Sequence, residues 1–314
     1  MPMTNNKLYA RDEYLKKKAA DSNGLNIQLT NNYAFRKTFK NTYIAKGFLM
    51  ALLGLKEDEI ADLKVTDPFE EGESEQEKEG ILDVKIYLNN NKKINIEMQN
   101  RYQNDWTERS LFYNCRMFTD GFYHGQSYGE LEPCIHIGIL DFNLMRSQGF
   151  HHHIKLLDIK TGEEYNDKLQ FHVVQLKKLE DAAKEEKETE LYYWAKLLAA
   201  KDWKEVDDTI KGNPYREAVK DEMYKMSQDE RERYLYLREE MAYSDEISRM
   251  KTAREEGLEE GRKEGRKEGR KEGKQLFLQC IRLKKQGFSK EKIAEECQVD
   301  IPEVEEILKE IEDL

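Results

Sequence analysis

The sequence predicts an α/β domain that is followed by an α-helical C-terminal region. Two neighbouring segments, ILDVKIYL (81–88) and KKINIEMQ (92–99), alternate apolar and polar residues with the period of two that is typical of β-strands. The segments on either side of them place large apolar residues at helical spacings instead. From about residue 178 onward, only helical patterns remain. Strands and helices therefore mix in the first half of the chain and not in the second.

The α/β domain begins with a predicted helix at 31–53, whose phenylalanine and leucine residues recur at helical spacings. A short strand candidate at 61–69 is stopped by Pro68, and an acidic stretch that we expect to be a loop follows it. The two period-two segments come next. The three asparagines between them, 89–91, favour a turn, so we expect a β-hairpin.

The rest of the α/β domain alternates a helix with further strands. Residues 106–124 return to a helical pattern that carries Trp106 and several phenylalanines. The segment PCIHIGILDF (133–142) is short, apolar and rich in isoleucine, which indicates a buried central strand. Residues 154–158 and 169–176 are expected to add another strand pair. We place this domain at approximately 25–178.

The C-terminal region divides into a helical part at 179–250, a repeat at 251–275 and a small helical pair at 276–314. The repeat sets glycine at every fourth position from Gly257 to Gly273. Each interior glycine costs a helix about 1 kcal/mol, so propensity predicts a marginal helix. A charged spacer is one interpretation of the repeat, and self-association into a homo-oligomer through close helix approach is the other.

The terminal helical pair carries helix-capping signals but is acidic. Ser289 can cap its first helix, and Asp300 with Glu303 forms a capping-box pattern at its second. Acidic side chains repel phosphates, so a protein contact is favoured over a DNA contact here.

The charge composition bears on whether the protein binds nucleic acid. The 314 residues include 52 Lys and Arg against 63 Asp and Glu, a formal net charge of -11, which is unlike that of a typical nucleic-acid-binding protein. The charge is uneven, because residues 1–55 carry nine basic and three acidic side chains. Electrostatic attraction acts locally, so this stretch remains a candidate for contacting phosphates.

The same composition argues for a cytoplasmic protein without a membrane anchor. No apolar run approaches the length of a membrane span, and the N-terminal stretch lacks the apolar segment of a secretory signal. The four cysteines form no C-x-x-C pair, which excludes a structural zinc ribbon and suits a reducing compartment.

The hairpin carries the residues with the clearest chemistry. Asp83 and Lys85 share one face of the first strand, and Glu97 and Gln99 share one face of the second. Apolar faces match only if paired residue numbers have an even sum. A sum of 180 sets Asp83 opposite Glu97, whereas a sum of 182 sets Asp83 opposite Gln99 and Lys85 opposite Glu97. In either register the four side chains lie within roughly 4.5–8 Å of one another.

Two carboxylates beside a main-chain carbonyl are ligands that suit Mg²⁺. The alternative is a solvated polar face on which Lys85 and Glu97 form a surface ion pair of little energetic weight. Spacing alone leaves both interpretations open.

The ordered set LTNNYAFRKTF, ILDVKIYL, INIEMQ, RSLFYNCRMFTDGFYHG and CIHIGILDF resembles the recombination-promoting nuclease/putative transposase family of bacteria. The resemblance covers nearly the whole chain, since that family also carries a helical tail with Gly-Glu-Lys/Arg repeats. It implies a restriction-endonuclease-like PD-(D/E)XK core, in which a central mixed sheet is flanked by helices.

The implied function is that of a metal-dependent DNA endonuclease, which hydrolyses phosphodiester bonds with a metal-activated water. Asp83 and Glu97 would be the ligands of Mg²⁺, or of Mn²⁺ as the alternative ion. Gln99 would be the third catalytic residue, and it stands where the wider superfamily often has lysine. A neutral amide can orient a water or a phosphate but cannot supply a positive charge.

Five further residues are candidates for DNA binding. Arg109 and Tyr113 lie four apart on the helix after the motif and would project together, and the guanidinium could clamp a phosphate. Arg36, Lys37 and Lys40 on the first helix could contact the DNA backbone. For each basic side chain, the alternative is an ordinary solvated position on a helix surface.

Three smaller features complete the sequence-based interpretation. Asn32 is expected to cap the first helix, and Glu79 in the acidic loop is the residue best placed to assist the metal. The run from His151 to His153 is expected to lie at the surface, because consecutive side chains on a strand diverge.

Two rival functions remain. The first is a catalytically silent nuclease-like module that binds DNA or protein and self-associates through its tail. The second is a purely structural helical interaction protein, which the nuclease-like hairpin disfavours.

Overall fold

The computed structural model describes residues 5–21, 25–66, 83–89 and 91–312. These residues contain a six-stranded sheet of order β1-β2-β3-β4-β6-β5. The strands are β1 (Leu63–Thr66), β2 (Val84–Leu88), β3 (Lys92–Gln99), β4 (Cys134–Leu140), β5 (His151–Leu157) and β6 (Glu164–Gln175). The pairs β3/β4 and β4/β6 are parallel and the other neighbours are antiparallel, so the sheet is mixed.

The β2–β3 hairpin adopts the first of the two predicted registers. Val84 pairs with Ile96 and Ile86 pairs with Ile94, so paired residue numbers add to 180. This register keeps the isoleucines of both strands on one buried face. β2 begins one residue after Asp83. In this register Asp83 therefore lies at the open end of the hairpin, opposite Glu97.

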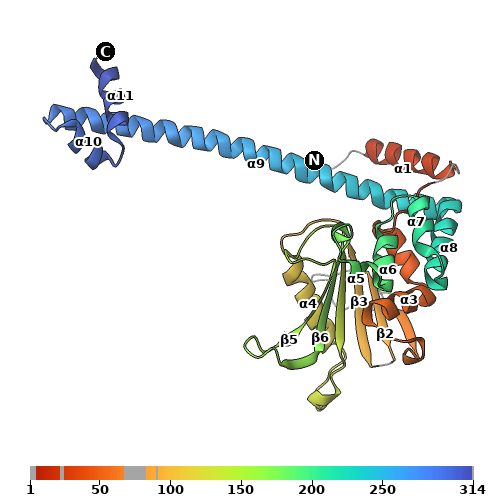
Figure 1. Ribbon diagram of the computed structural model, residues 1–314. Coiled ribbons are helices and arrows are strands. Elements are labelled where there is room, and N and C mark those ends of the chain that lie inside the picture. The colour runs from red at the N-terminus through yellow and green to blue at the C-terminus, as the bar shows by residue number, and fades with distance from the viewer. Residues whose placement is uncertain (1–4, 22–24, 67–82, 90, 313–314) are drawn as a thin grey trace. The chain divides into compact units, whose positions relative to one another are not determined.

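Helix α4 (Trp106–Thr119) is the crossover that makes β3 and β4 parallel neighbours. It covers one face of the sheet, while α3 (Thr42–Leu53) and α6 (Glu190–Ala199) lie on the other (Figure 1). The predicted helix at 106–124 ends earlier, because the main chain turns to an extended conformation at Asp120. All seven residues of β4 are buried, as expected for a central strand between two layers.

The single helix predicted at 31–53 is wrong, because the chain breaks there into α2 (Asn32–Phe39) and α3. Asn41 has extended backbone angles and its side chain accepts a hydrogen bond from the Tyr43 N–H, which starts a second helix. The cap of α2 is Asn31 and not Asn32, since Asn31 Oδ1 accepts from the N–H groups of Tyr33 and Ala34.

A second group of helices completes the core on the side of α3. It comprises α5 (Lys184–Lys187), α6, α7 (Trp203–Ile210) and α8 (Pro214–Gln228). At Gly47 in α3 a Cβ atom would lie 2.4 Å from the Tyr215 side chain, so only glycine permits this approach of α3 and α8. The apolar cluster extends along the chain from Leu15 to Leu237.

The start of α9 (Glu230–Lys285) fastens the N-terminal segment to this core. Arg233 Nε donates to the Ala19 carbonyl in α1 (Asn5–Ala20), and the carbonyl of Tyr236 accepts from Asn31 Nδ2 at 3.3 Å. The α2 cap is thereby held by a residue more than two hundred positions further along the chain. Three 3-10 turns complete the described elements: η1 (Glu57–Glu59), η2 (Tyr128–Glu130) and η3 (Leu176–Lys178).

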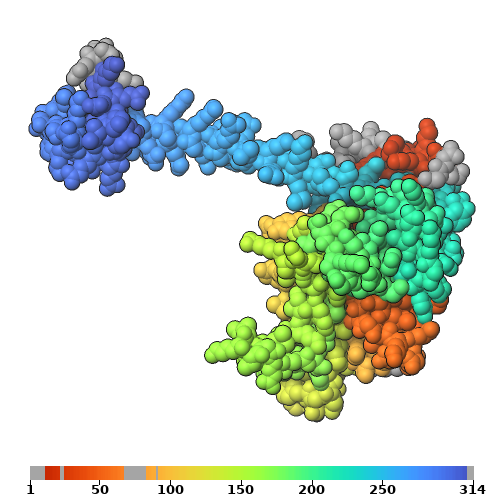
Figure 2. Space-filling view, in the orientation of Figure 1, coloured from red at the N-terminus to blue at the C-terminus, as the bar shows by residue number. Residues whose placement is uncertain are grey.

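The described chain separates into two compact units, residues 1–242 and 243–314. In the second unit the glycine repeat is helical and forms part of α9, and its side chains are exposed along the visible face (Figure 2). The helices α10 (Lys290–Cys297) and α11 (Ile301–Glu312) pack with the end of α9 around a small cluster of buried side chains that includes Cys280, Ile293 and Val304. No helix in the described parts of the chain is both long and apolar enough to cross a membrane.

Candidate active site

Asp83 and Glu97 lie side by side at the open end of the hairpin. Asp83 Oδ2 accepts a hydrogen bond from the main-chain N–H of Met98 at 2.9 Å, which fixes the carboxylate against β3. Glu97 is 3% exposed, and Asp83 is also buried. The structure therefore brings the two predicted metal ligands together on one face, under the N-terminal half of α4.

Burial sets the electrostatics of this pair. Burial is the main reason that the pKa of Glu97 is raised to about 7; the charge of Arg109 opposes this rise, and the charge of Asp83 contributes to it. Burial likewise raises the pKa of Asp83 to about 6, against the lowering effects of the Met98 N–H, Arg36 and Arg109. Both carboxyl groups therefore change protonation close to neutral pH.

Arg109 provides the direct counter-charge. Its Nη2 donates to Glu97 Oε1 at 2.6 Å, and its Nη1 donates to Gln103 Oε1 at 3.0 Å. The guanidinium carbon also lies 5.7 Å from the centre of the Tyr113 ring. The i, i+4 spacing thus places Arg109 and Tyr113 together, as the sequence predicts, with the cationic group directly on a carboxylate.

The interpretation of this face as solvated is wrong. Lys85, Asn95, Glu97 and Gln99 are all buried beneath α4. Lys85 Nζ donates to Asp120 Oδ2 at 3.2 Å, and Glu97 pairs with Arg109. Burying a row of polar residues costs free energy of folding unless they form hydrogen bonds or ion pairs with one another or with a ligand.

Gln99 lies at the end of β3, where its Nε2 donates to the Arg101 carbonyl at 3.1 Å. The side chain is buried, and this hydrogen bond ties its amide group to the main chain just beyond the strand. Gln99 is thus placed on the same face as Glu97, two residues further along.

The basic residues of α2 separate into two groups. Arg36 is close enough to Asp83 for its charge to lower the pKa of that carboxyl group. Lys37 Nζ instead forms an ion pair with Glu232 Oε1 at 3.1 Å, and Lys40 is exposed at the helix end. The charge of Arg36 thus acts on the Asp83 carboxyl group, whereas that of Lys37 is paired with Glu232.

His136 and Asn95 are two residues of the site that the sequence-based interpretation missed. His136 Nε2 lies 3.7 Å from Glu97 Oε2, and His136 Nδ1 lies 3.1 Å from Asn95 Nδ2. Burial lowers the pKa of His136 to about 3, and the charge of Arg109 adds to this effect. The available signal was a lone polar residue among the isoleucines of a predicted central strand.

Gly138 explains how α4 comes so close to the carboxylates. It pairs with Glu97 across the parallel β3–β4 register, and a Cβ atom at this position would lie 2.2 Å from the Trp106 ring. The missing side chain allows Trp106, the first residue of α4, to lie directly on β4 beside Glu97.

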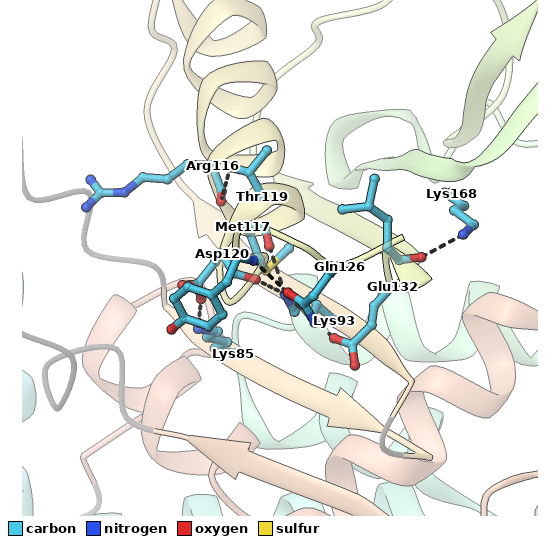
Figure 3. A network of polar contacts seen from close by, with 11 residues as sticks. Lys85, Lys93, Arg116, Met117, Thr119, Asp120, Gln126, Glu132 and Lys168 are labelled. Atoms are coloured by element: carbon cyan, nitrogen blue, oxygen red, sulfur yellow. Dashed lines mark hydrogen bonds and ion pairs between the residues drawn. The ribbon is translucent and has the colours of Figure 1, made fainter. Parts of the chain in front are cut away.

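The other end of α4 is held by two buried lysines, shown in Figure 3. Lys93 Nζ donates to the carbonyl of Met117 at 3.4 Å and to the carbonyl of Asp120, and it lies 3.6 Å from Glu132 Oε2. Cations at a helix C-terminus satisfy its last carbonyl groups and its dipole. Together with Lys85, Lys93 therefore fixes the C-terminal end of α4, while Arg109 ties its first half to Glu97.

The histidine run is less exposed than we predicted. His151 Nε2 lies 2.9 Å from Nδ1 of the buried His172 on β6, and the rings of His151 and His153 both stack on that of His172. Among the described residues, no group of three or more His, Cys, Asp and Glu side chains is arranged to hold a metal ion. Glu79, the predicted assistant to the metal, lies outside the described residues.

The pair Asp83 and Glu97 fits a divalent cation by its chemistry. It offers two carboxylates, one just before β2 and one on β3, and no sulfur or histidine ligand, which is the donor set that Mg²⁺ prefers when phosphate oxygens and water complete its shell. The charge of Asp83 raises the pKa of Glu97, and burial raises the pKa of both carboxyl groups, so a bound cation would offset their repulsion and their desolvation.

Comparison with known proteins gives the family. A family model described as PD-(D/E)XK nuclease family transposase matches residues 29–253, well over half of the chain. The chain belongs to this PD-(D/E)XK nuclease transposase family. The resemblance drawn from the sequence and the predicted fold class are thereby confirmed. No curated protein and no solved structure matches the sequence.

The family match spans all six strands and the start of α9, so it includes every residue of the Asp83–Glu97 face. A PD-(D/E)XK nuclease transposase core is also consistent with the mixed sheet and with the helices on both of its faces.

Proposed function

We propose that this protein is a divalent-metal-dependent DNA endonuclease of the recombination-promoting, transposase-like kind. The observation that carries the proposal is the pairing of Asp83 with Glu97 on one buried face, with Arg109 directly on Glu97. Family membership supports a nuclease, and nucleases of this kind generally use divalent metals. DNA is the substrate that the family implies.

Each residue of the site has a role in this proposal. Asp83 and Glu97 hold Mg²⁺ or Mn²⁺, an ion that would activate a water and neutralise charge on the phosphodiester. Gln99 orients the reacting groups through its amide. Arg36 and Arg109 attract and clamp the phosphate, and Tyr113 supports the Arg109 guanidinium through its ring.

The test is a cleavage assay on supercoiled plasmid DNA with Mg²⁺, Mn²⁺, Ca²⁺ or EDTA. We expect nicked or linear products with Mg²⁺ or Mn²⁺, and none with EDTA. Cleavage that persists in EDTA, or in a folded Glu97→Gln variant, would show that the chemistry takes place elsewhere.

A catalytically silent module that binds DNA and self-associates through its tail is the second candidate. Gln99 favours it, since the amide supplies neither a proton nor a positive charge at neutral pH. Two results together would select this candidate: DNA binding that depends on Arg36 and Arg109, and no cleavage with any metal ion.

Because the described structure shows four free thiols, both candidates suit a reducing cytoplasm.

A further inference from the structure

Two fully buried polar side chains stand directly behind Glu97. Asn95 lies two residues before Glu97 on β3, and His136 is its partner on β4 in the parallel register. Both have no exposed surface. The three side chains are in contact one after another: Asn95 Nδ2 lies 3.1 Å from His136 Nδ1, and His136 Nε2 lies 3.7 Å from Glu97 Oε2.

The geometry selects one tautomer of His136. Asn95 Nδ2 is a donor, so the ring nitrogen that faces it, Nδ1, must accept. The proton of a neutral ring is then on Nε2 and points toward Glu97. The ionised form of Glu97 requires the same arrangement, because a lone pair on Nε2 would face its negative charge.

The Nε2–H group lacks a hydrogen-bond partner within the described chain, and Asn95 Oδ1 lacks one too. At 3.7 Å from Glu97 Oε2, Nε2 is within a small shift of hydrogen-bond distance. Arg109 already donates to the other carboxylate oxygen, Oε1. Donors on both oxygens would fix the plane of the Glu97 carboxylate.

We propose that His136, oriented by Asn95, is a positioning residue that aims the Glu97 carboxylate at the divalent cation. The inference rests on the proposed function, in which Glu97 is a metal ligand. A neutral N–H group suits this task because it orients the carboxylate without placing a second positive charge next to the cation. Hydrogen-bonded partners behind a ligand typically change metal affinity by about 10- to 100-fold when they are removed.

The first test measures Mn²⁺ binding to the full-length protein by titration calorimetry. We expect His136→Phe to weaken binding by about 10- to 100-fold, and His136→Gln to restore part of the loss because its amide can still donate. His172→Phe is the matched control, because His172 is also a buried strand histidine but pairs with Ile137 and so lies on the opposite face of the sheet. The affinity of the His172→Phe variant for Mn²⁺ should equal that of the wild type.

The second test needs no variant of His136. At pH 8, where Glu97 is ionised, nitrogen NMR of the metal-free wild type should show His136 as the neutral tautomer with its proton on Nε2. Asn95→Asp should move the proton toward Nδ1 and weaken Mn²⁺ binding, because the new carboxylate accepts from that nitrogen. A wild-type ring protonated on Nδ1 alone would overturn the positioning role of His136 even if His136→Phe does not fold.

The two ideas fail in different ways. Wild-type affinity for Mn²⁺ in a folded His136→Phe variant overturns the positioning role and leaves the proposed function standing. Wild-type protein that does not bind Mn²⁺ at all overturns the proposed function, and the positioning role with it.

Discussion

The Nη2 atom of Arg109 lies 2.6 Å from Oε1 of Glu97, which joins α4 to β3 at the centre of the candidate active site. The Glu97 side chain is buried and the Arg109 side chain is half-buried, so salt screens their attraction less than that of a surface ion pair. The guanidinium therefore opposes the effect of burial on Glu97 and keeps the carboxylate available near neutral pH.

Replacing Arg109 with Gln should move metal binding to higher pH. Without the guanidinium, the pKa of Glu97 rises further above about 7, and the midpoint of Mn²⁺ binding should increase by at least about one pH unit. Mn²⁺ titrations between pH 5.5 and pH 9 measure the shift. Arg116→Gln, an exposed change on the same helix, is the control, and an equal shift in both variants would argue against a local effect.

Glu97→Gln and Asp83→Asn should each lower the cleavage rate by about a thousandfold without loss of the fold. The loss corresponds to roughly 4 kcal/mol of transition-state stabilisation, in line with the several kcal/mol that a metal ion supplies. Plasmid cleavage and thermal unfolding measure the two properties. Glu108→Gln removes an exposed carboxylate from α4 and should cut at the wild-type rate.

In a chelator, the stability of the wild type relative to Glu97→Gln should fall as pH rises. The pKa of Glu97 is about 7 in the folded state against an ordinary value of 4.5, so its contribution is complete below 4.5 and is lost through about 7. The difference should be on the order of a few kcal/mol. Urea unfolding of both proteins from pH 5 to pH 8 gives this difference directly.

Mg²⁺ should reverse that loss for the wild type alone. At pH 8 the ion should raise the unfolding temperature of the wild type and leave Glu97→Gln unchanged, because binding to the native state stabilises it. At pH 5 the carboxyl groups are protonated and the ion should have little effect. Equal stabilisation of both proteins at pH 8 would place the Mg²⁺ site elsewhere.

Lys93→Met should destabilise the protein by about 1–3 kcal/mol. The change leaves the carbonyl groups of Met117 and Asp120 at the end of α4 without their buried donor. Urea unfolding measures the effect, and Lys92→Met at the neighbouring position is the control. A loss of the same size at both positions would indicate a general effect of charge on β3.

Deletion of residues 251–314 should leave the α/β core folded. Along the chain, Leu237 is the last buried residue of the core cluster, and the partly buried Met241 packs against this cluster. The truncation therefore removes no residue of the cluster. We expect an unfolding temperature within a few degrees of that of the full chain, together with a change in oligomeric state or in DNA binding. Thermal unfolding and light scattering measure both, and a truncated chain that does not fold would show that the tail packs on the core.

The sequence alone predicted the hairpin and placed Asp83 near Glu97, because period-two alternation is a local property of the two strands. It did not predict the break at Asn41, since asparagine is compatible with a helix interior as well as with a cap. In that case the side-chain hydrogen bond to the Tyr43 N–H, and not the apolar pattern, decides where the helix begins.

The position of His136 depends on tertiary packing that no local pattern encodes. Parallel pairing of β3 with β4 is set by the crossover helix, and its register places Asn95 beside His136 and Glu97 beside Gly138. The contact between Trp106 and Gly138 then brings α4 over this row. A sequence read one segment at a time contains none of these distances.

The hydrogen bond from Asn31 to the Tyr236 carbonyl has a consequence for protein synthesis. The helix that carries Arg36 begins at a cap that is held by a residue from the far end of the core. While a ribosome is still making the first two hundred residues, that partner does not exist. The start of α2, and with it the position of Arg36, should therefore be fixed only after Tyr236 has left the ribosome.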